Sequence, residues 1–156
     1  AAYYKGGGAD AGYWAYPTQS DTMPGNTIGG ATNQGNFYNG VYSVTQSPDP
    51  DPDQNYLTDA GAFSNTAGAY GTFDQAGNAF EWNDAVYKSA YRNTRGGSWY
   101  NVGGELPSSY RYNETPGTET DTLGFRLATI PAPSTHALLV LSAAGLCAGA
   151  IRRRCA

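Results

Sequence analysis

The stretch that decides the fold begins with Gly71-Thr72-Phe73-Asp74-Gln75-Ala76-Gly77-Asn78-Ala79-Phe80-Glu81-Trp82. Three shorter segments continue it, namely Arg95-Gly96-Gly97-Ser98-Trp99, Ser109-Tyr110-Arg111 and Gly124-Phe125-Arg126-Leu127-Ala128. Together they combine glycines, which allow positive φ and close backbone approach, with aromatic side chains that bury large areas. Their arginines offer a rigid set of donors to carbonyl and carboxylate oxygens. This combination predicts a compact domain with little regular structure, held together by side-chain-to-backbone hydrogen bonds.

The order and spacing of these segments resemble the formylglycine-generating enzyme (sulfatase-modifying factor) family. That family carries G-N-x-W-E-W, R-G-G-S-W/Y, an arginine segment and G-F-R, which match Gly77 to Trp82, Arg95 to Trp99, Arg111 and Gly124 to Arg126. The resemblance covers residues 1–129 and corresponds to the C-terminal part of the family domain, so we interpret the domain as N-terminally truncated. It implies an irregular, loop-rich α+β fold that is related to C-type lectins and binds calcium.

Local sequence patterns give a coarse assignment of secondary structure. Residues 79–87 are expected to form a short strand or a helical turn, and residues 94–100 and 123–129 read as strands between glycines. Residues 101–122 are expected to be mostly loop because glycine and proline interrupt them. Proline alternates with aspartate over residues 47–53, which predicts a surface loop.

Composition indicates an acidic domain with an aromatic core. The 156 residues include 13 tyrosines and 21 glycines, whereas Leu, Ile and Val are scarce before residue 137. Residues 1–130 contain six basic and thirteen acidic residues, a formal charge of −7. Nucleic-acid binding depends on neutralising phosphates, so this charge argues against it. It is compatible with cation binding or a solvated extracellular surface.

The chemistry of the domain is limited by what residues 1–129 lack. The single histidine, His136, and both cysteines, Cys147 and Cys155, lie beyond them. A Ser-His-Asp or Cys-His nucleophilic site, and a zinc site of Cys and His, are therefore excluded for this part of the chain.

The resemblance also locates the copper site of the family's oxidases, which uses two cysteines. The first corresponds to Asn101, and the second falls near Glu105 or Leu106. Amide and carboxylate oxygens are poor ligands for Cu(I), which prefers sulfur. The sequence therefore argues against copper and against formylglycine generation by that route.

Calcium has better support, because it prefers six to eight oxygen ligands. One family calcium implies ligands at the side chains of Asp74 and Glu81 and at the carbonyls of Gly77 and Ala79. The alternative interpretation is that Asp74 caps a turn and Glu81 pairs with an arginine. For a second family calcium the nearest equivalents are Asn36, Phe37, Asp53 and Asn55.

Residues 130–156 have a different character. An apolar run over residues 137–151 follows a Pro-rich segment and precedes three arginines, which predicts a transmembrane helix at about 136–151 with its basic end cytoplasmic. This tail resembles the PEP-CTERM sorting signal, with Ala132 in place of the usual glutamate. The resemblance implies export and cleavage by an exosortase-type membrane protease, and it rests on Pro131, Pro133, Ser134, Thr135, Arg152, Arg153 and Arg154. The alternative is a plain tail anchor.

Two functions are consistent with these observations. The leading hypothesis is an exported cell-surface module that binds calcium and recognises a glycan or a protein in an exopolysaccharide context. The alternative is an enzyme of the sulfatase-modifying-factor or non-heme iron family, whose catalytic residues lie in an N-terminal part outside this sequence.

Overall fold

The computed structural model describes residues 2–127. The membrane helix expected at 136–151 and the expected sorting signal lie outside these residues. The chain divides into two units, Ala1–Arg126 and Leu127–Ala156, and every helix and strand below belongs to the first. Residues 2–127 contain no helix that is long and apolar enough to cross a membrane.

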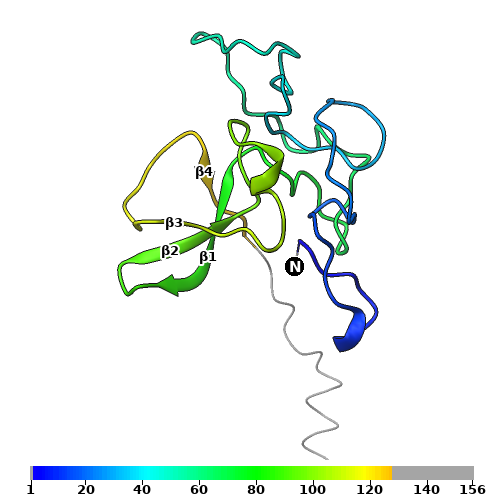
Figure 1. Cartoon of the computed structure of the whole chain (residues 1–156), viewed down its shortest axis with the longest axis vertical. Helices are drawn as coiled ribbons and strands as arrows, with labels where there is room; N and C mark the ends of the chain where they lie inside the picture. Colours follow the sequence, from blue (N-terminus) through cyan, green and yellow to red (C-terminus); the bar gives the residue numbers. More distant parts are fainter. Residues whose placement is uncertain (1, 128–156) are drawn as a thin grey trace, which may run out of the picture. The chain divides into compact units, whose positions relative to one another are not determined.

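One four-stranded sheet organises the first unit (Figure 1). Its strands are β1 (Phe80–Tyr87), β2 (Tyr91–Arg95), β3 (Tyr112–Glu114) and β4 (Leu123–Gly124). They lie in the order β3-β2-β1-β4. The β1–β2 and β2–β3 pairs are antiparallel, whereas β4 runs parallel to β1.

The β1–β2 hairpin sets the register of the sheet. Lys88 and Ser89 turn the chain with φ angles of 48° and 64°, a conformation that suits tight hairpins. Tyr87 faces Tyr91 at the turn, and an irregularity follows between Trp82 and Val86. At the far end the register places Glu81 opposite Arg95.

The strand assignments from sequence are partly wrong. The strand expected over 94–100 ends at Arg95, because Gly96 and Gly97 adopt φ angles of 96° and 75° that a strand does not use. The strand expected over 123–129 is only the two residues of β4. Conversely, β3 lies within residues 101–122, which were expected to be mostly loop. It forms there because it pairs with β2.

Almost no helix is present in residues 2–127. The helical elements there are two 3₁₀ helices of three residues each, η1 (Ala9–Ala11) and η2 (Gly103–Glu105). The expected α+β class is therefore correct for the strands and loops and not for an α-helical part. Frequent glycines at positive φ explain this, since each one interrupts a regular backbone path.

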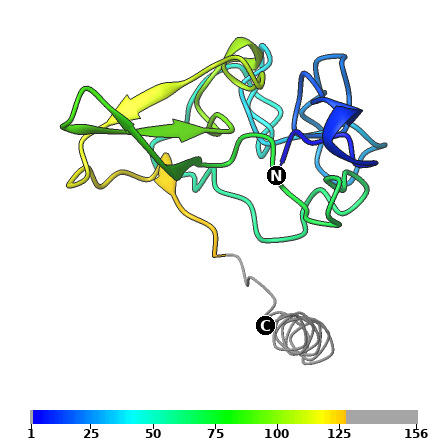
Figure 2. The same ribbon diagram turned by 90° about the horizontal axis from the view of Figure 1, so that it is seen from below.

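Long loops make up the rest of this unit, and Figure 2 shows the strands on one side of it and the N-terminal loops on the other. Isolated backbone bridges connect these loops, including Asn36 with Gly77 and Tyr38 with Val102. The Asn36 side chain is buried and donates to the Tyr56 carbonyl at 2.8 Å and to Asn78 Oδ1 at 2.9 Å. Side chains therefore satisfy the backbone where ladders are absent.

The core is largely aromatic, as composition predicted. Phe37 and Leu106 are completely buried, and Phe63 and Phe80 are nearly so. Beside them Tyr42, Tyr56 and Trp99 form a stack, in which the Tyr56 and Trp99 ring centroids lie 4.8 Å apart. Such ring pairs each add roughly 0.5–1.5 kcal/mol beyond the area they bury.

Gly77→Ala tests the tightest approach that a glycine of residues 2–127 makes to another backbone segment. A Cβ at Gly77 would lie 1.9 Å from the Asn36 carbonyl oxygen, so the two backbones would have to separate. We expect a loss of more than about 3 kcal/mol in the free energy of unfolding, measured by chemical denaturation.

Gly71→Ala is the matched control, because Gly71 has φ 71° against 74° at Gly77 but no atom within 4 Å of a built Cβ. It carries the conformational cost alone, roughly 1–2 kcal/mol. Equal losses in the two variants would contradict the importance of the Asn36 contact.

Candidate functional site

A cleft lined by tyrosines lies beside the sheet. Its volume is about 280 Å³. We call it the tyrosine cleft, and its lining residues are Phe80, Tyr100, Asn101, Glu105, Tyr110, Tyr112, Glu114, Thr120, Thr122 and Leu123. They come from β1, β3 and β4, from η2 and from the loops that follow the Gly96-Gly97 turn.

A hydrogen-bonded chain of side chains includes Asn101 and Glu105, two lining residues of the tyrosine cleft. Ser98 donates to the amide oxygen of Asn101, and the Asn101 amide nitrogen donates to Glu105 at 2.6 Å. Leu106 is completely buried behind them. The positions that the family resemblance assigns to copper cysteines thus hold a bonded amide, a carboxylate and a core leucine.

The cleft combines aromatic faces with oxygen acceptors. Tyr112 stacks on Phe80 with ring centroids 5.5 Å apart, and Tyr100 packs edge-on against Trp99. Burial, followed by the charge of Glu105, raises the pKa of Tyr110, so this phenol stays protonated and can donate. Polyhydroxylated ligands need such a mixture of apolar faces and directed polar groups.

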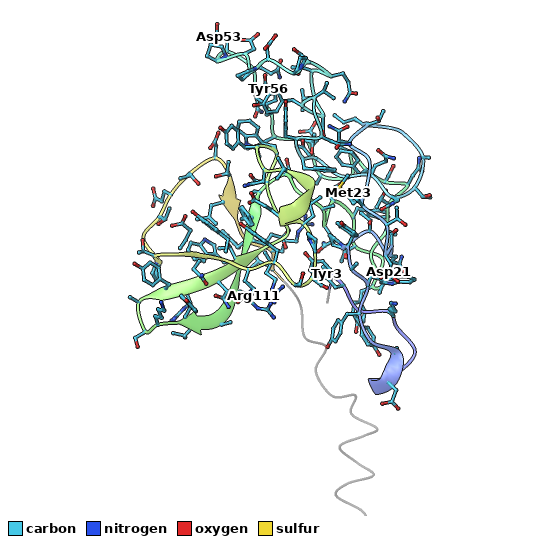
Figure 3. All side chains as sticks on the ribbon, viewed as in Figure 1. Tyr3, Asp21, Met23, Asp53, Tyr56 and Arg111 are labelled. Atoms are coloured by element: carbon cyan, nitrogen blue, oxygen red, sulfur yellow. The ribbon has the colours of Figure 1, made fainter. Side chains whose placement is uncertain are left out.

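A second hollow, about 520 Å³ in volume, lies near β1 and β2. We call it the arginine cavity, because Arg95 and Arg111 both line it together with Tyr3, Tyr13, Glu81 and Trp82. Tyr3 and Arg111 are labelled in Figure 3. The cavity therefore brings the chain start, the hairpin and the segment after η2 together.

Asp74 and Glu81, the carboxylates of the first expected calcium site, each have protein partners. Buried Asp74 accepts hydrogen bonds from the backbone N–H groups of Gly61 and Phe63. Arg126 binds Glu81 through Nε and the Asp74 carbonyl through its guanidinium. These contacts match the alternative interpretation from sequence.

The expected ligand atoms at Asp74, Gly77, Ala79 and Glu81 are all oxygens, which is the type of ligand that calcium prefers. The carbonyl oxygens of Gly77 and Ala79 accept no hydrogen bond from the described loops. In residues 2–127 no three His, Cys, Asp or Glu side chains are grouped to hold a metal ion. Calcium here would thus depend on backbone carbonyls and would compete with Arg126 for Glu81.

The second expected set is distributed between the core and a loop tip. Asn36 and Phe37 are buried, and the Asn36 amide is used by Tyr56 and Asn78. Asp53 is exposed on the loop labelled in Figure 3, and Asn55 Oδ1 accepts from the Leu57 N–H at 3.0 Å. No described contact connects the two pairs.

Sequence reasoning did not identify either hollow. It treated Arg95, Tyr110 and Arg111 as architecture, and it did not connect Tyr3 with them. One signal was available in the sequence: Arg95 and Arg111 have no acidic residue directly beside them that could pair with their charge. Only the chain path shows that these residues share a cavity.

Two curated relatives are similar to part of this chain. The serine/threonine-protein kinase pkn1 of Chlamydia caviae is 31% identical over 81 residues, covering 40% of this chain and 13% of the kinase. The pkn1 kinase of Chlamydia pneumoniae is 31% identical over 78 residues, covering 38% of this chain and 13% of the kinase. The match spans about one eighth of the length of each kinase, and kinase activity is a property of those proteins.

A family model covers most of the chain. The model of the sulfatase-modifying factor enzyme 1-like domain matches residues 3–130. This range contains the sheet, the tyrosine cleft, the arginine cavity and the four sequence segments that suggested the resemblance. The chain therefore belongs to the family of sulfatase-modifying factor enzyme 1-like (formylglycine-generating enzyme) domains.

Proposed function

We propose that this domain is a ligand-binding member of its family rather than a copper oxidase, and that the tyrosine cleft binds a glycan. The observation that carries the proposal is the replacement of the expected copper cysteines. Asn101 is bonded to Ser98 and Glu105, and Leu106 belongs to the core. Cu(I) prefers sulfur ligands, which these positions do not offer.

The composition of the cleft supports a sugar ligand. Tyr100 and Tyr112 offer partly exposed ring faces, and Glu105, Glu114 and two threonines offer polar atoms for hydroxyl groups. Among the residues that the structure describes, none of those lining the cleft is basic, so an anionic ligand would meet carboxylates with no cationic partner in the lining. A neutral sugar suits this lining best.

Tyr100→Ala should weaken binding of a neutral hexose oligomer such as cellotetraose. Tyr100 is 62% exposed, so its loss should remove a stacking face with little effect on stability. We expect a dissociation constant about threefold to tenfold higher, measured by calorimetric titration of the full chain.

Tyr70→Ala is the control, because Tyr70 is 65% exposed but lies outside the cleft. Equal weakening in both variants would show that binding does not use the cleft. Conversion of a substrate-peptide cysteine to an aldehyde by the copper-loaded chain would overturn the proposal as a whole.

We also propose that the Asp74 segment binds calcium. The support is the family membership, the two carboxylates and the carbonyls of Gly77 and Ala79, which accept no hydrogen bond from the described loops. Calcium supplies a positive charge that bridges loop oxygens when it is bound. The residues that would hold it are Asp74, Gly77, Ala79 and Glu81.

Calcium should raise the melting temperature of the full chain relative to chelator, and Glu81→Gln should reduce the increase. Binding to the native state alone adds about 2.7 kcal/mol at a calcium concentration 100-fold above the dissociation constant. Glu119→Gln, an exposed carboxylate elsewhere, is the control. A folded protein whose midpoint is the same with calcium, magnesium and chelator would rule the site out.

For the cellular context we propose, from sequence alone, that residues 130–156 direct export and are removed by an exosortase-type protease, which leaves the domain at the cell surface. Replacing Arg152, Arg153 and Arg154 by Asp should leave the protein unprocessed or misoriented, because the orienting charge is lost. Mass spectrometry of surface-exposed protein checks this. A mature wild-type product that keeps the three arginines would contradict cleavage and favour a plain tail anchor.

A further inference from the structure

The arginine cavity is separate from the tyrosine cleft, and sugar binding at the cleft does not explain it. Its volume of about 520 Å³ lies within the range of about 300–1,000 Å³ that is typical of small-molecule sites. The residues that matter for its chemistry are Tyr3, Tyr13, Glu81, Trp82, Arg95 and Arg111.

Backbone contacts hold both arginines in place. Arg95 Nη1 donates to the carbonyl oxygens of Ser108 and, at 3.0 Å, of Tyr110. Arg111 Nη1 donates to the Ser109 carbonyl at 3.1 Å. A guanidinium has five N–H donors, and the other donors of both arginines meet no acceptor in residues 2–127. Both groups are thus positioned and incompletely bonded.

The charges that face the cavity do not balance. Among residues 2–127 the ion pairs are Lys5 with Asp21 and Arg126 with Glu81. Glu81 is the one acid among the lining residues, and Arg126 already neutralises it. Neither lining arginine therefore has a carboxylate partner in the described part of the chain.

The two arginines also interact with each other. Burial, and after it the charge of Arg111, lowers the pKa of Arg95. The two like charges line the same cavity, so each disfavours the other. A ligand anion bound by both would remove this repulsion and accept the unused N–H donors.

Aromatic side chains form part of the remaining walls, beside Ala2, Asn83 and Ser108. Trp82 and Tyr13 line the cavity, and Tyr13 is largely exposed. Tyr3 donates to the Leu106 carbonyl at 2.7 Å, and burial raises the pKa of Tyr3 to about 12. The Tyr3 phenol is therefore neutral at physiological pH and supplies no counter-charge to the arginines.

We propose that the arginine cavity binds a carboxylate-bearing sugar of the hexuronate class, with its carboxylate on Arg95 and Arg111 and its ring against Trp82 or Tyr13. Guanidinium groups bind planar carboxylates through paired hydrogen bonds. Aromatic walls suit the apolar face of a sugar ring. Because the overall negative charge of the domain repels anions, the attraction must come from direct contact between the ligand and the two arginines.

The test is a calorimetric titration of the full chain with glucuronate, with glucose as the neutral match and inorganic phosphate as a second anion. The binding that Arg111→Gln weakens reports on the arginine cavity, whereas any glucose bound at the tyrosine cleft is unaffected by that substitution. At the cavity glucuronate should bind, and glucose should bind at least about tenfold more weakly, because it cannot satisfy the arginines. Arg111→Gln should weaken glucuronate binding by a similar factor. Arg111 is exposed, and its one side-chain hydrogen bond within residues 2–127 goes to the Ser109 carbonyl. The variant should therefore remain folded, which a thermal melt would check.

Arg92→Gln is the matched control. It removes the same charge from β2, the strand that also carries Arg95, but Arg92 is not among the described residues that line the cavity. It should leave glucuronate binding unchanged. Equal weakening in both variants would mean that the effect comes from the change in net charge, and it would contradict binding at the arginine cavity. Phosphate binding as tight as glucuronate would overturn the assignment to a sugar acid. Tyr100→Ala should not affect glucuronate, so failure here is distinguishable from failure of the glycan proposal at the cleft.

Discussion

The contact between Asn36 and Gly77 is the constraint on which the rest of the described fold depends. Asn36 donates from its N–H to the Ala76 carbonyl at 3.0 Å, and its carbonyl accepts from the Asn78 N–H at 2.7 Å. Two backbones can lie this close only where a side chain is missing, and glycine provides that at position 77. Asn36 and Gly77 lie outside the strands of the sheet, so this isolated bridge joins the two segments where no strand pairing does.

Both hollows depend on the same bridge through a short series of bonds. Gly77 donates to the Gly96 carbonyl at 2.7 Å, and Trp99 donates to the Asn78 carbonyl at 3.0 Å. These bonds fix the turn after β2. Arg95 precedes that turn and belongs to the arginine cavity, whereas Asn101 follows it and belongs to the tyrosine cleft. One glycine-dependent contact thus helps to position two hollows with differently charged linings.

The sequence predicted those features that are local or carried by family motifs. It identified the family and the aromatic core, because glycine, aromatic and charge spacing is readable along the chain. For residues 79–87 it left a short strand and a helical turn open, and the structure has β1 there, at Phe80–Tyr87. The sequence missed β3, since Tyr112–Glu114 is stabilised by pairing with β2 rather than by its own pattern. It also could not place Arg126 beside Glu81, because 45 residues separate them and only the parallel pairing of β4 with β1 brings them together.

Local charge, rather than net charge, decides what such a domain can bind. The formal charge of −7 for residues 1–130 suggests a preference for cations everywhere. The tyrosine cleft is consistent with this in disfavouring anions, since its charged lining residues are Glu105 and Glu114. The arginine cavity does not, because Arg126 neutralises its only acid and leaves Arg95 and Arg111 without partners among residues 2–127. Charges at contact distance in a partly buried cavity are screened far less than distant surface charges. The two hollows should therefore discriminate ligands by charge, even though both lie on one acidic domain.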